Sequence, residues 1–199
     1  MPRGRPRSFD IDKAVETAMV VFWSKGYEGT TIPDLTSAIG INRPSLYAAF
    51  GSKEDLFRLA LDRYRKDPAS YVNRAIAKPT AFEVMAGLLE GVIDLVTDPK
   101  RPGGCLFVCG THPLSQRNNG IHTELAARRI AGEKDIRKRF EQAAKTGDLP
   151  ETSDPKLLAK LAATLIWGVS IQAANGSTRS ELRKLAAITL ESLRGQLQG

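Results

Sequence analysis

The spacing of apolar residues constrains the fold of this chain more than any other feature. After Asp10, a good helix N-cap, apolar residues recur at intervals of three and four, on one face of a helix: Ile11, Ala14, Val15, Ala18, Met19 and Phe22. Nearly every segment between glycines and prolines repeats this period, and none alternates apolar and polar residues as a half-buried strand does. The chain is therefore predicted to be all-α, with about nine helices.

Length, charge and cysteine content narrow the class of protein. The 199 residues suffice to bury a sizeable core, and a net charge of +7 favours a polyanionic partner. Two cysteines are too few for a disulfide framework, which favours a reducing compartment. The longest uncharged apolar stretch, residues 161–174, is shorter than the roughly 20 residues needed to span a bilayer. We therefore expect a cytoplasmic protein with no membrane partner.

Two short predicted helices, residues 31–39 and 42–50, are joined by a turn that begins with Gly40. The glycine allows a tight turn, and this arrangement is typical of a helix-turn-helix whose second helix enters the DNA major groove. An ordinary core hairpin with a glycine turn fits the same pattern. The pattern alone therefore favours DNA binding without excluding a purely structural role.

A basic arm precedes this unit. Arg3, Arg5 and Arg7 alternate with glycine and proline, so the arm is too polar to fold by itself. Arms of this kind insert arginines into the narrow minor groove of A·T-rich DNA. The arm could also be a solvated tail, but its place directly before a helix-turn-helix favours DNA.

The segments 26–35 and 40–56 are the most specific part of the sequence. They read GYEGTTIPDL and GINRPSLYAAFGSKEDL, and this region resembles the tetracycline-repressor (TetR/AcrR) family of transcriptional regulators. The resemblance covers about residues 8–66 and is only architectural beyond them. It implies a basic arm (residues 1–7), a three-helix DNA-binding head (8–66), and a helical ligand-binding and dimerisation domain (67–199).

The DNA contacts are expected around the start of the two short helices. Arg43 and Ser45 begin the predicted recognition helix, where side chains reach base edges, and Arg43 can donate two hydrogen bonds to a guanine. Thr31 begins the preceding helix, whose free amides suit a phosphate. The resemblance implies phosphate contacts for Tyr47 and Lys53. Tyr47 could instead be a half-buried packing residue, and Lys53 could instead be a solvated charge at the start of a helix. The full expected set is Arg3, Arg5, Arg7, Thr31, Asn42, Arg43, Pro44, Ser45, Tyr47 and Lys53.

Two C-terminal helices are candidates for pairing two chains. Residues 157–174 are apolar on more than one face, so this helix needs cover on both sides. The resemblance suggests a four-helix interface in a homodimer, although burial within one subunit explains the pattern nearly as well. The expected interface residues are Leu158, Leu161, Leu165, Val169, Leu182, Leu185 and Leu193.

A pocket for a small molecule is expected among the helices between residues 81 and 139. Each of its candidate lining residues could equally be simple core. The candidates are Met85, Leu88, Leu89, Val92, Cys105, Phe107, Cys109, His112 and Trp167. The small-molecule effector cannot be named from them, and we expect no cofactor.

Cys105, Cys109 and His112 share one helix face if their segment is helical, because they lie at positions i, i+4 and i+7. This spacing allows a thiol redox switch or a soft-metal site. Only three ligands are evident, whereas a structural zinc site usually has four. Buried cysteines are more often inert packing, so we expect no metal site and treat redox sensing as an alternative.

The sequence thus predicts a homodimeric repressor that binds a palindromic operator and is released by a small molecule. The alternatives are a thiol-redox-responsive regulator that uses Cys105 and Cys109, an architectural DNA-binding protein without a ligand, and a helical enzyme. We expect no enzyme, because no phosphate-binding loop, dinucleotide-binding glycine pattern, metalloprotease motif or nucleophile elbow is present in the sequence.

Overall fold

The computed structural model describes residues 9–110 and 119–198. Within them every regular element is helical, so the all-α prediction is confirmed. The expected arm residues Arg3, Arg5 and Arg7 and the expected pocket residue His112 lie outside the described residues, and only the backbone of Cys109 is described.

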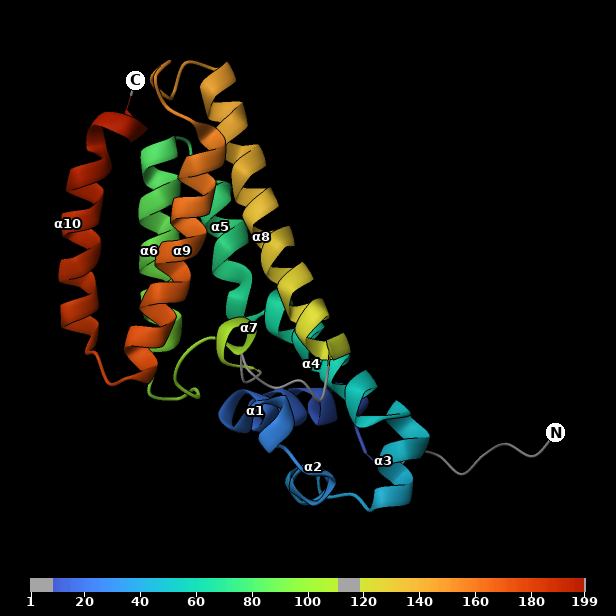
Figure 1. Ribbon diagram of the computed structural model, residues 1–199. Helices are drawn as coiled ribbons and strands as arrows, with labels where there is room; N and C mark the ends of the chain where they lie inside the picture. The colour runs from blue at the N-terminus through green and yellow to red at the C-terminus, as the bar shows by residue number, and fades with distance from the viewer. Residues whose placement is uncertain (1–8, 111–118, 199) are drawn as a thin grey trace.

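The helices form a small head joined to a larger bundle (Figure 1). The head contains α1, α2 and α3, and α4 runs from it to the bundle of α5, α6, α8, α9 and α10. The short α7 lies between α1 and the bundle. The helices are α1 (Ile11–Gly29), α2 (Ile32–Ile39), α3 (Arg43–Phe50), α4 (Lys53–Lys66), α5 (Tyr71–Ile76), α6 (Ala81–Val96), α7 (Leu106–Cys109), α8 (Asn119–Lys145), α9 (Pro155–Ala174) and α10 (Arg179–Leu197).

Side-chain caps explain where most of these helices begin. Four of them start with a capping box, in which a serine or threonine hydroxyl accepts from the N3 amide and the N3 carboxylate accepts from the cap amide. The pairs are Thr31–Asp34, Ser52–Asp55, Thr80–Glu83 and Thr178–Glu181. Within α1, Gly26 has a φ of 70°, a left-handed conformation that favours glycine and interrupts the helix.

The sequence did not predict α5. The preceding helix, α4, ends at Lys66, two residues before Pro68, which lacks the amide donor needed to continue it. The chain then forms a single 3₁₀ turn, Pro68–Ser70, and continues directly into α5. Proline fits this turn because it occupies the first helical position, where no amide donor is needed. Tyr71 and Ala75 bury the inner face of α5.

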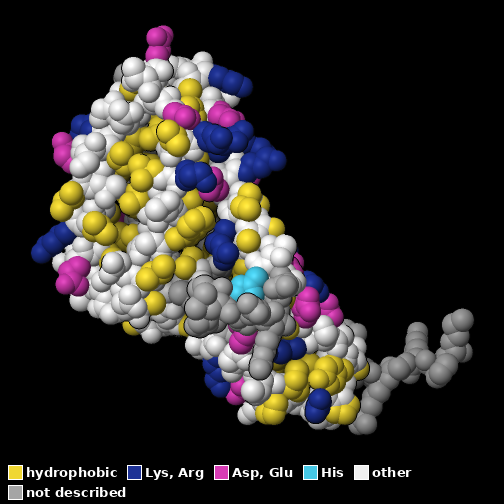
Figure 2. All heavy atoms as spheres, viewed as in Figure 1, with side chains coloured by type: hydrophobic (Ala, Val, Ile, Leu, Met, Phe, Trp, Pro, Cys, Tyr) yellow, Lys and Arg dark blue, Asp and Glu magenta, His cyan; other side chains and the backbone are white. Residues whose placement is uncertain are grey.

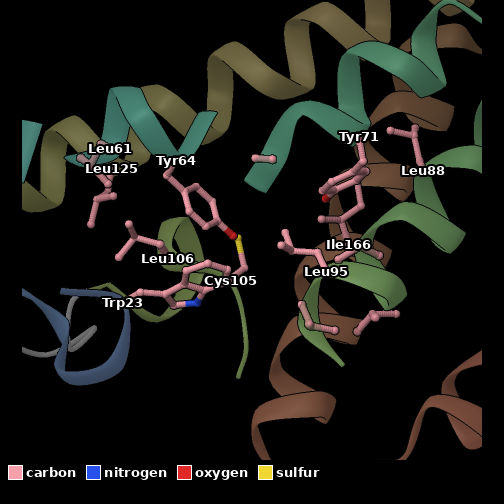
Figure 3. Packing of buried hydrophobic residues seen from close by; sticks show 14 of the residues in the cluster. Trp23, Leu61, Tyr64, Tyr71, Leu88, Leu95, Cys105, Leu106, Leu125 and Ile166 are labelled. Carbon is pink, nitrogen blue, oxygen red and sulfur yellow. The ribbon is translucent and has the colours of Figure 1, made fainter. Parts of the chain in front are cut away.

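One continuous core joins the head to the bundle. Trp23 of α1 packs edge-on against Tyr64 of α4, with ring centroids 4.8 Å apart, and Tyr64 packs edge-on against Phe107 of α7 at 5.0 Å. Figure 3 shows the first pair beside Cys105 and Leu106. Edge-to-face aromatic pairs have a preferred geometry, so this cluster fixes how α1, α4 and α7 meet.

Among the described residues only α9 is long and apolar enough to cross a membrane by length and composition. The sequence argument counted only residues 161–174, whereas the helix has 20 residues. In the structure α9 contacts α8 along one side and α6 along another. This is the arrangement of a core helix in a bundle.

A tight contact between α5 and α6 gives a stability prediction. A Cβ atom on Gly91 would lie 2.4 Å from Cδ2 and 2.7 Å from Cγ of the Tyr71 ring, so Gly91→Ala must displace that ring. We expect a loss of at least about 1 kcal/mol in the free energy of unfolding, measured by chemical denaturation. Gly195→Ala is the control, because its added Cβ meets no atom within 4 Å. Equal stability of the two variants would contradict this packing.

Candidate DNA-binding site and effector cavity

The turn between α2 and α3 has the geometry of a helix-turn-helix. Gly40 has a φ of 77°, a left-handed conformation that favours glycine, and the amides of Gly40 and Ile41 both donate to the Thr36 carbonyl. Leu35 and Leu46 are fully buried where the two helices meet. The packing therefore holds α3 against the head and leaves its outer face free.

The start of α3 presents polar groups to solvent. The Asn42 side chain accepts from the Ser45 amide at 2.9 Å, which caps the helix and leaves Arg43 exposed in its first turn. The Arg43 guanidinium donates to the Tyr47 hydroxyl at 3.4 Å and lies 5.5 Å from the centroid of that ring. The structure thus brings Asn42, Arg43 and Tyr47 together, with Pro44 exposed beside them and Ser45 half-buried.

Lys53 lies beyond the C-terminal end of α3, at the first position of α4. Its Nζ lies 4.3 Å from the centroid of the Tyr27 ring, a cation–π geometry that ties the start of α4 to the end of α1. Burial lowers the pKa of Lys53, and Glu28 and Asp34 oppose this effect. A partly desolvated ammonium of this kind interacts strongly with an added anion.

Thr31 is already engaged by a neighbouring carboxylate. Its hydroxyl donates to Asp34 at 2.8 Å and its amide donates to the same oxygen at 2.8 Å. Lys25 donates to the other Asp34 oxygen at 2.6 Å. The hydrogen bond from Lys25, followed by those from Thr31, holds the pKa of Asp34 well below its usual range. Thr31 therefore acts first as a helix cap, and its expected phosphate contact remains a prediction.

A cavity of about 80 Å³ lies in the bundle, between α5, α7, α8 and α9. Apolar and aromatic side chains dominate its wall, and a few charged groups lie among them. Figure 3 shows three of its lining residues, Cys105, Tyr71 and Ile166, which come from three different parts of the chain. The lining residues are Arg65, Ala69, Tyr71, Val72, Asn73, Cys105, Phe107, Val108, Arg128, Arg129, Gly132, Glu133, Ile136, Ala163, Ile166 and Trp167.

The expected pocket residues divide into two groups. Cys105, Phe107 and Trp167 line the cavity. Four residues on α6 do not, because they lie on the face of that helix that fills the hydrophobic core: Met85, Leu88, Leu89 and Val92. The sequence argument also missed the contributions of α5 and α8, whose lining residues show no pocket pattern of their own.

The short segment from Gly104 to Gly110 connects this cavity with the DNA-binding head. The Trp23 indole donates to the Gly104 carbonyl at 3.1 Å, and the Tyr27 amide donates to the Gly110 carbonyl at 2.7 Å. Between these two contacts, Cys105 and Phe107 form part of the cavity wall. One segment thus contacts α1 on one side and the cavity on the other.

Ion pairs join α4 to α8 beside the cavity. Arg58 donates to Glu124 at 2.8 Å, and Arg128 donates to Glu124 at 2.9 Å and to Asp62 at 2.6 Å. Burial raises the pKa of Glu124, but the hydrogen bonds from Arg128 and Arg58 outweigh it and leave the pKa below its ordinary value. Arg128 therefore lines the cavity and also pairs with Asp62 of α4.

The outer faces of α9 and α10 expose apolar side chains. We call this the α9–α10 face; it comprises Leu157, Leu161, Leu165 and Ile171 of α9 and Leu185 and Ile188 of α10. Figure 2 shows apolar side chains gathered over this part of the bundle. Single exposed apolar residues are normal on a monomer, whereas a contiguous group on two helices is typical of an interaction surface.

Three of the expected interface residues are not on this face. Leu158, Val169 and Leu182 are buried in the core of their own chain, because they point toward α6 and α8 rather than outward. Leu161, Leu165 and Leu193 are half-buried, and Leu185 is exposed. Leu157, Ile171 and Ile188 lie on this face and are not among the expected residues, although a stripe of every third or fourth residue from Leu157 includes the two on α9.

Comparison with known proteins follows the same division of the chain. Residues 14–60 match the model of bacterial regulatory proteins of the tetR family, and residues 81–196 match that of the tetracyclin repressor-like C-terminal domain. The chain is 33% identical over 190 residues to the HTH-type transcriptional repressor ComR of Escherichia coli. This match covers 94% of this chain and 90% of ComR.

Solved structures agree with the sequence relatives. The TetR family regulator CifR, a cysteine mutant complexed with 26-bp double-strand operator DNA, has a TM-score of 0.90 and 37% identity, and the match covers 94% of this chain and 98% of CifR. A putative TetR regulator from Rhodococcus sp. RHA1 is 39% identical, with a TM-score of 0.61 and coverage of 92% and 99%. The chain therefore belongs to the tetracycline-repressor (TetR) family of DNA-binding transcriptional regulators.

Proposed function

We propose that this regulator is a homodimeric repressor that leaves a palindromic operator when a small molecule occupies the bundle cavity. TetR-family regulators are dimeric and bind small-molecule effectors. Several relatives, including ComR, are named transcriptional repressors. We further propose a cytoplasmic location and no catalytic role, since these relatives are named regulators and not enzymes.

The observation that carries this proposal is the double role of the segment from Gly104 to Gly110. It holds α1 through two hydrogen bonds, and Cys105 and Phe107 in its middle line the cavity. A ligand that displaces these two side chains also moves the contacts to α1. A ligand shifts such an equilibrium only by its difference in affinity for the two arrangements, so the cavity must differ between them.

The size of the cavity supports this coupling. A cavity of about 150 Å³ is known to accept benzene, whereas this one has about 80 Å³. A ligand whose ring lies wholly inside this cavity must therefore push the walls apart. Close-packed interiors transmit such displacements, here through the segment 104–110 to α1 and through Arg128 to α4.

A side chain grown into the cavity tests this mechanism without knowledge of the effector. Ala163 lines the cavity on α9, and Gly132 lines it on α8, where an added Cβ meets no atom within 4 Å. We expect Ala163→Phe and Gly132→Phe to imitate the ligand and to weaken operator binding about tenfold, within the usual range of allosteric coupling. Fluorescence anisotropy with labelled operator DNA measures the change.

Ala144→Phe is the matched control, because Ala144 is exposed on α8 and does not line the cavity. It should bind the operator as the unaltered protein does. Circular dichroism and sedimentation show whether each variant stays folded and dimeric. A cavity-filled variant that is folded, dimeric and fully competent in operator binding would contradict the proposed mechanism.

Cys105 serves in this proposal as a packing residue and not as a redox sensor. It is buried, and Figure 3 shows the Tyr64 hydroxyl pointing at its sulfur. The described residues hold no group of three or more histidine, cysteine, aspartate or glutamate side chains that could bind a metal ion.

We expect Cys105→Ser, alone or with Cys109→Ser, to lose some stability and to keep operator binding. The reason is that a serine hydroxyl fits the volume of the thiol but is more costly to bury. Treating both proteins with peroxide decides between packing and sensing. If peroxide releases the unaltered protein from its operator and leaves the double serine variant bound, the thiols are sensors.

A further inference from the structure

The charges around the cavity indicate the kind of ligand that it takes. Three of its charged lining residues are neutralised by partners outside the cavity. The pairs are Arg65 with Asp135 at 2.7 Å, Arg128 with Asp62 at 2.6 Å, and Glu133 with Lys160 at 3.3 Å. These residues hold neighbouring helices together, so their charges are already balanced before a ligand enters.

Arg129 differs from these three residues. Its guanidinium donates to the backbone carbonyl of Phe107 at 2.7 Å. The ion pairs among the described residues include Arg65 and Arg128 but not Arg129. The stretches outside residues 9–110 and 119–198 contain no aspartate or glutamate, so all 22 acidic side chains are accounted for. Among the described residues Arg129 is thus a cavity-lining cation without a carboxylate partner, and the ionisable group that acts on it is the Cys105 thiol.

The position of Arg129 makes this unbalanced charge significant. The residue is only partly exposed, and burial lowers the pKa of its guanidinium, whereas the neighbouring Cys105 thiol opposes this effect. A guanidinium has five N–H donors, of which the Phe107 carbonyl uses one. The remaining donors can hold a carboxylate with two parallel hydrogen bonds, a charge-assisted and geometrically specific contact.

The rest of the cavity wall is suited to an apolar body. Val72, Phe107, Ile136, Ile166 and Trp167 contribute aliphatic and aromatic surface. The cavity volume of about 80 Å³ favours a compact body of a few carbon atoms or a single ring. Ligand sites commonly combine such a wall with a small number of placed polar groups.

We propose that the effector is a small organic anion, with one carboxylate held by Arg129 and a compact apolar or aromatic body against Trp167 and its neighbours. This inference rests on the proposed function, because it names the chemical class of the effector that the bundle cavity takes. It also connects the ligand to the head, since Arg129 donates to Phe107 in the segment that contacts α1. An anion that draws Arg129 toward itself pulls on that segment.

Calorimetric titration of the full-length protein with matched acids and amides tests the proposal. The probes are benzoate against benzamide, and cyclohexanecarboxylate against its amide, because each pair differs in charge and hardly in shape. We expect each carboxylate to bind at least about tenfold more tightly than its amide, since a charge-assisted contact contributes more than a neutral one.

Two variants on the same helix locate the contact. Arg129→Gln keeps a donor for the Phe107 carbonyl and removes the charge, so it should abolish the preference for the acid. Arg129→Lys should restore part of that preference. Arg137→Gln is the control, because Arg137 is exposed and pairs with Glu141 at 2.7 Å, and it should leave the preference unchanged.

Three results would overturn this assignment: equal binding of acid and amide, a preference that survives in Arg129→Gln, or no binding of either member of both pairs. Operator binding by the same protein sample separates this failure from a failure of the proposed function. If the protein binds its operator normally and gives any of these results, the proposed function stands and the proposal of an anionic effector is wrong. Loss of operator binding by the unaltered protein would instead contradict the function itself.

Discussion

Replacement of Ile188 by glutamate is expected to separate the two subunits and to weaken operator binding by at least about a hundredfold. Ile188 is 68% exposed in the single chain and lies at the centre of the outer side of α10, within the α9–α10 face. A carboxylate in an apolar dimer interface is left desolvated and unpaired, which is costly. The two heads then bind DNA independently. They lose the gain in overall affinity that a linked pair of sites provides, typically a factor of 10² to 10⁴.

Sedimentation at micromolar concentration and operator binding by anisotropy measure the two effects. Ile130→Glu is the matched control, because Ile130 is 65% exposed but lies on α8, outside the α9–α10 face. This control should remain dimeric and should bind the operator normally. A dimeric Ile188→Glu variant with full operator affinity would show that the subunits pair through another surface.

Arg43→Ala is expected to lose about 1–3 kcal/mol of operator affinity and to relax selection at one base pair. Arg43 is exposed in the first turn of the recognition helix, where its guanidinium can form two hydrogen bonds with a guanine. Its contact with Tyr47 spans 3.4 Å, so little is lost when the side chain turns toward DNA. Sequencing of the DNA that each protein selects from a random pool measures the change.

Lys53→Gln provides the contrast. Its ammonium lies over the Tyr27 ring at the start of α4, where a phosphate contact gives no sequence information. This variant should bind all DNA sequences more weakly by about the same factor. The slope of log affinity against log salt concentration should fall by about one. Loss of selectivity in Lys53→Gln with uniform weakening in Arg43→Ala would mean that the two roles are reversed.

The fold could be predicted from the sequence wherever local chemistry decides it. Capping pairs such as Thr80–Glu83 and the glycine at position 40 act within a few residues of the helix ends that they determine. The helix α5 could not be predicted in this way. It has six residues and no side-chain cap, so the burial of Tyr71 against Gly91 determines it, and that contact is distant in sequence.

The DNA-binding head and the bundle cavity differ in the same way, because local sequence determines the first and tertiary packing the second. The geometry of the head could be predicted, because the residues expected to contact DNA lie on one short helix and the turns around it. The cavity could not, because it depends on which face of each helix meets a neighbour. Met85 and Leu88 have the composition of a pocket wall but fill the core, whereas Arg129 looks like one charge on a solvated helix face and lines the cavity instead. Periodicity identifies buried residues and does not separate packed from hollow surroundings.

Selection of operator DNA by the full-length protein, followed by footprinting of the selected site, tests the central claim most directly. A homodimer that reads DNA with α3 must protect an inverted repeat, with its two half-sites about 34–36 Å apart or another whole number of helical turns. We expect such a repeat, with the protected bases centred on its twofold axis. A single unrepeated half-site, or binding without any selected sequence, would contradict the account.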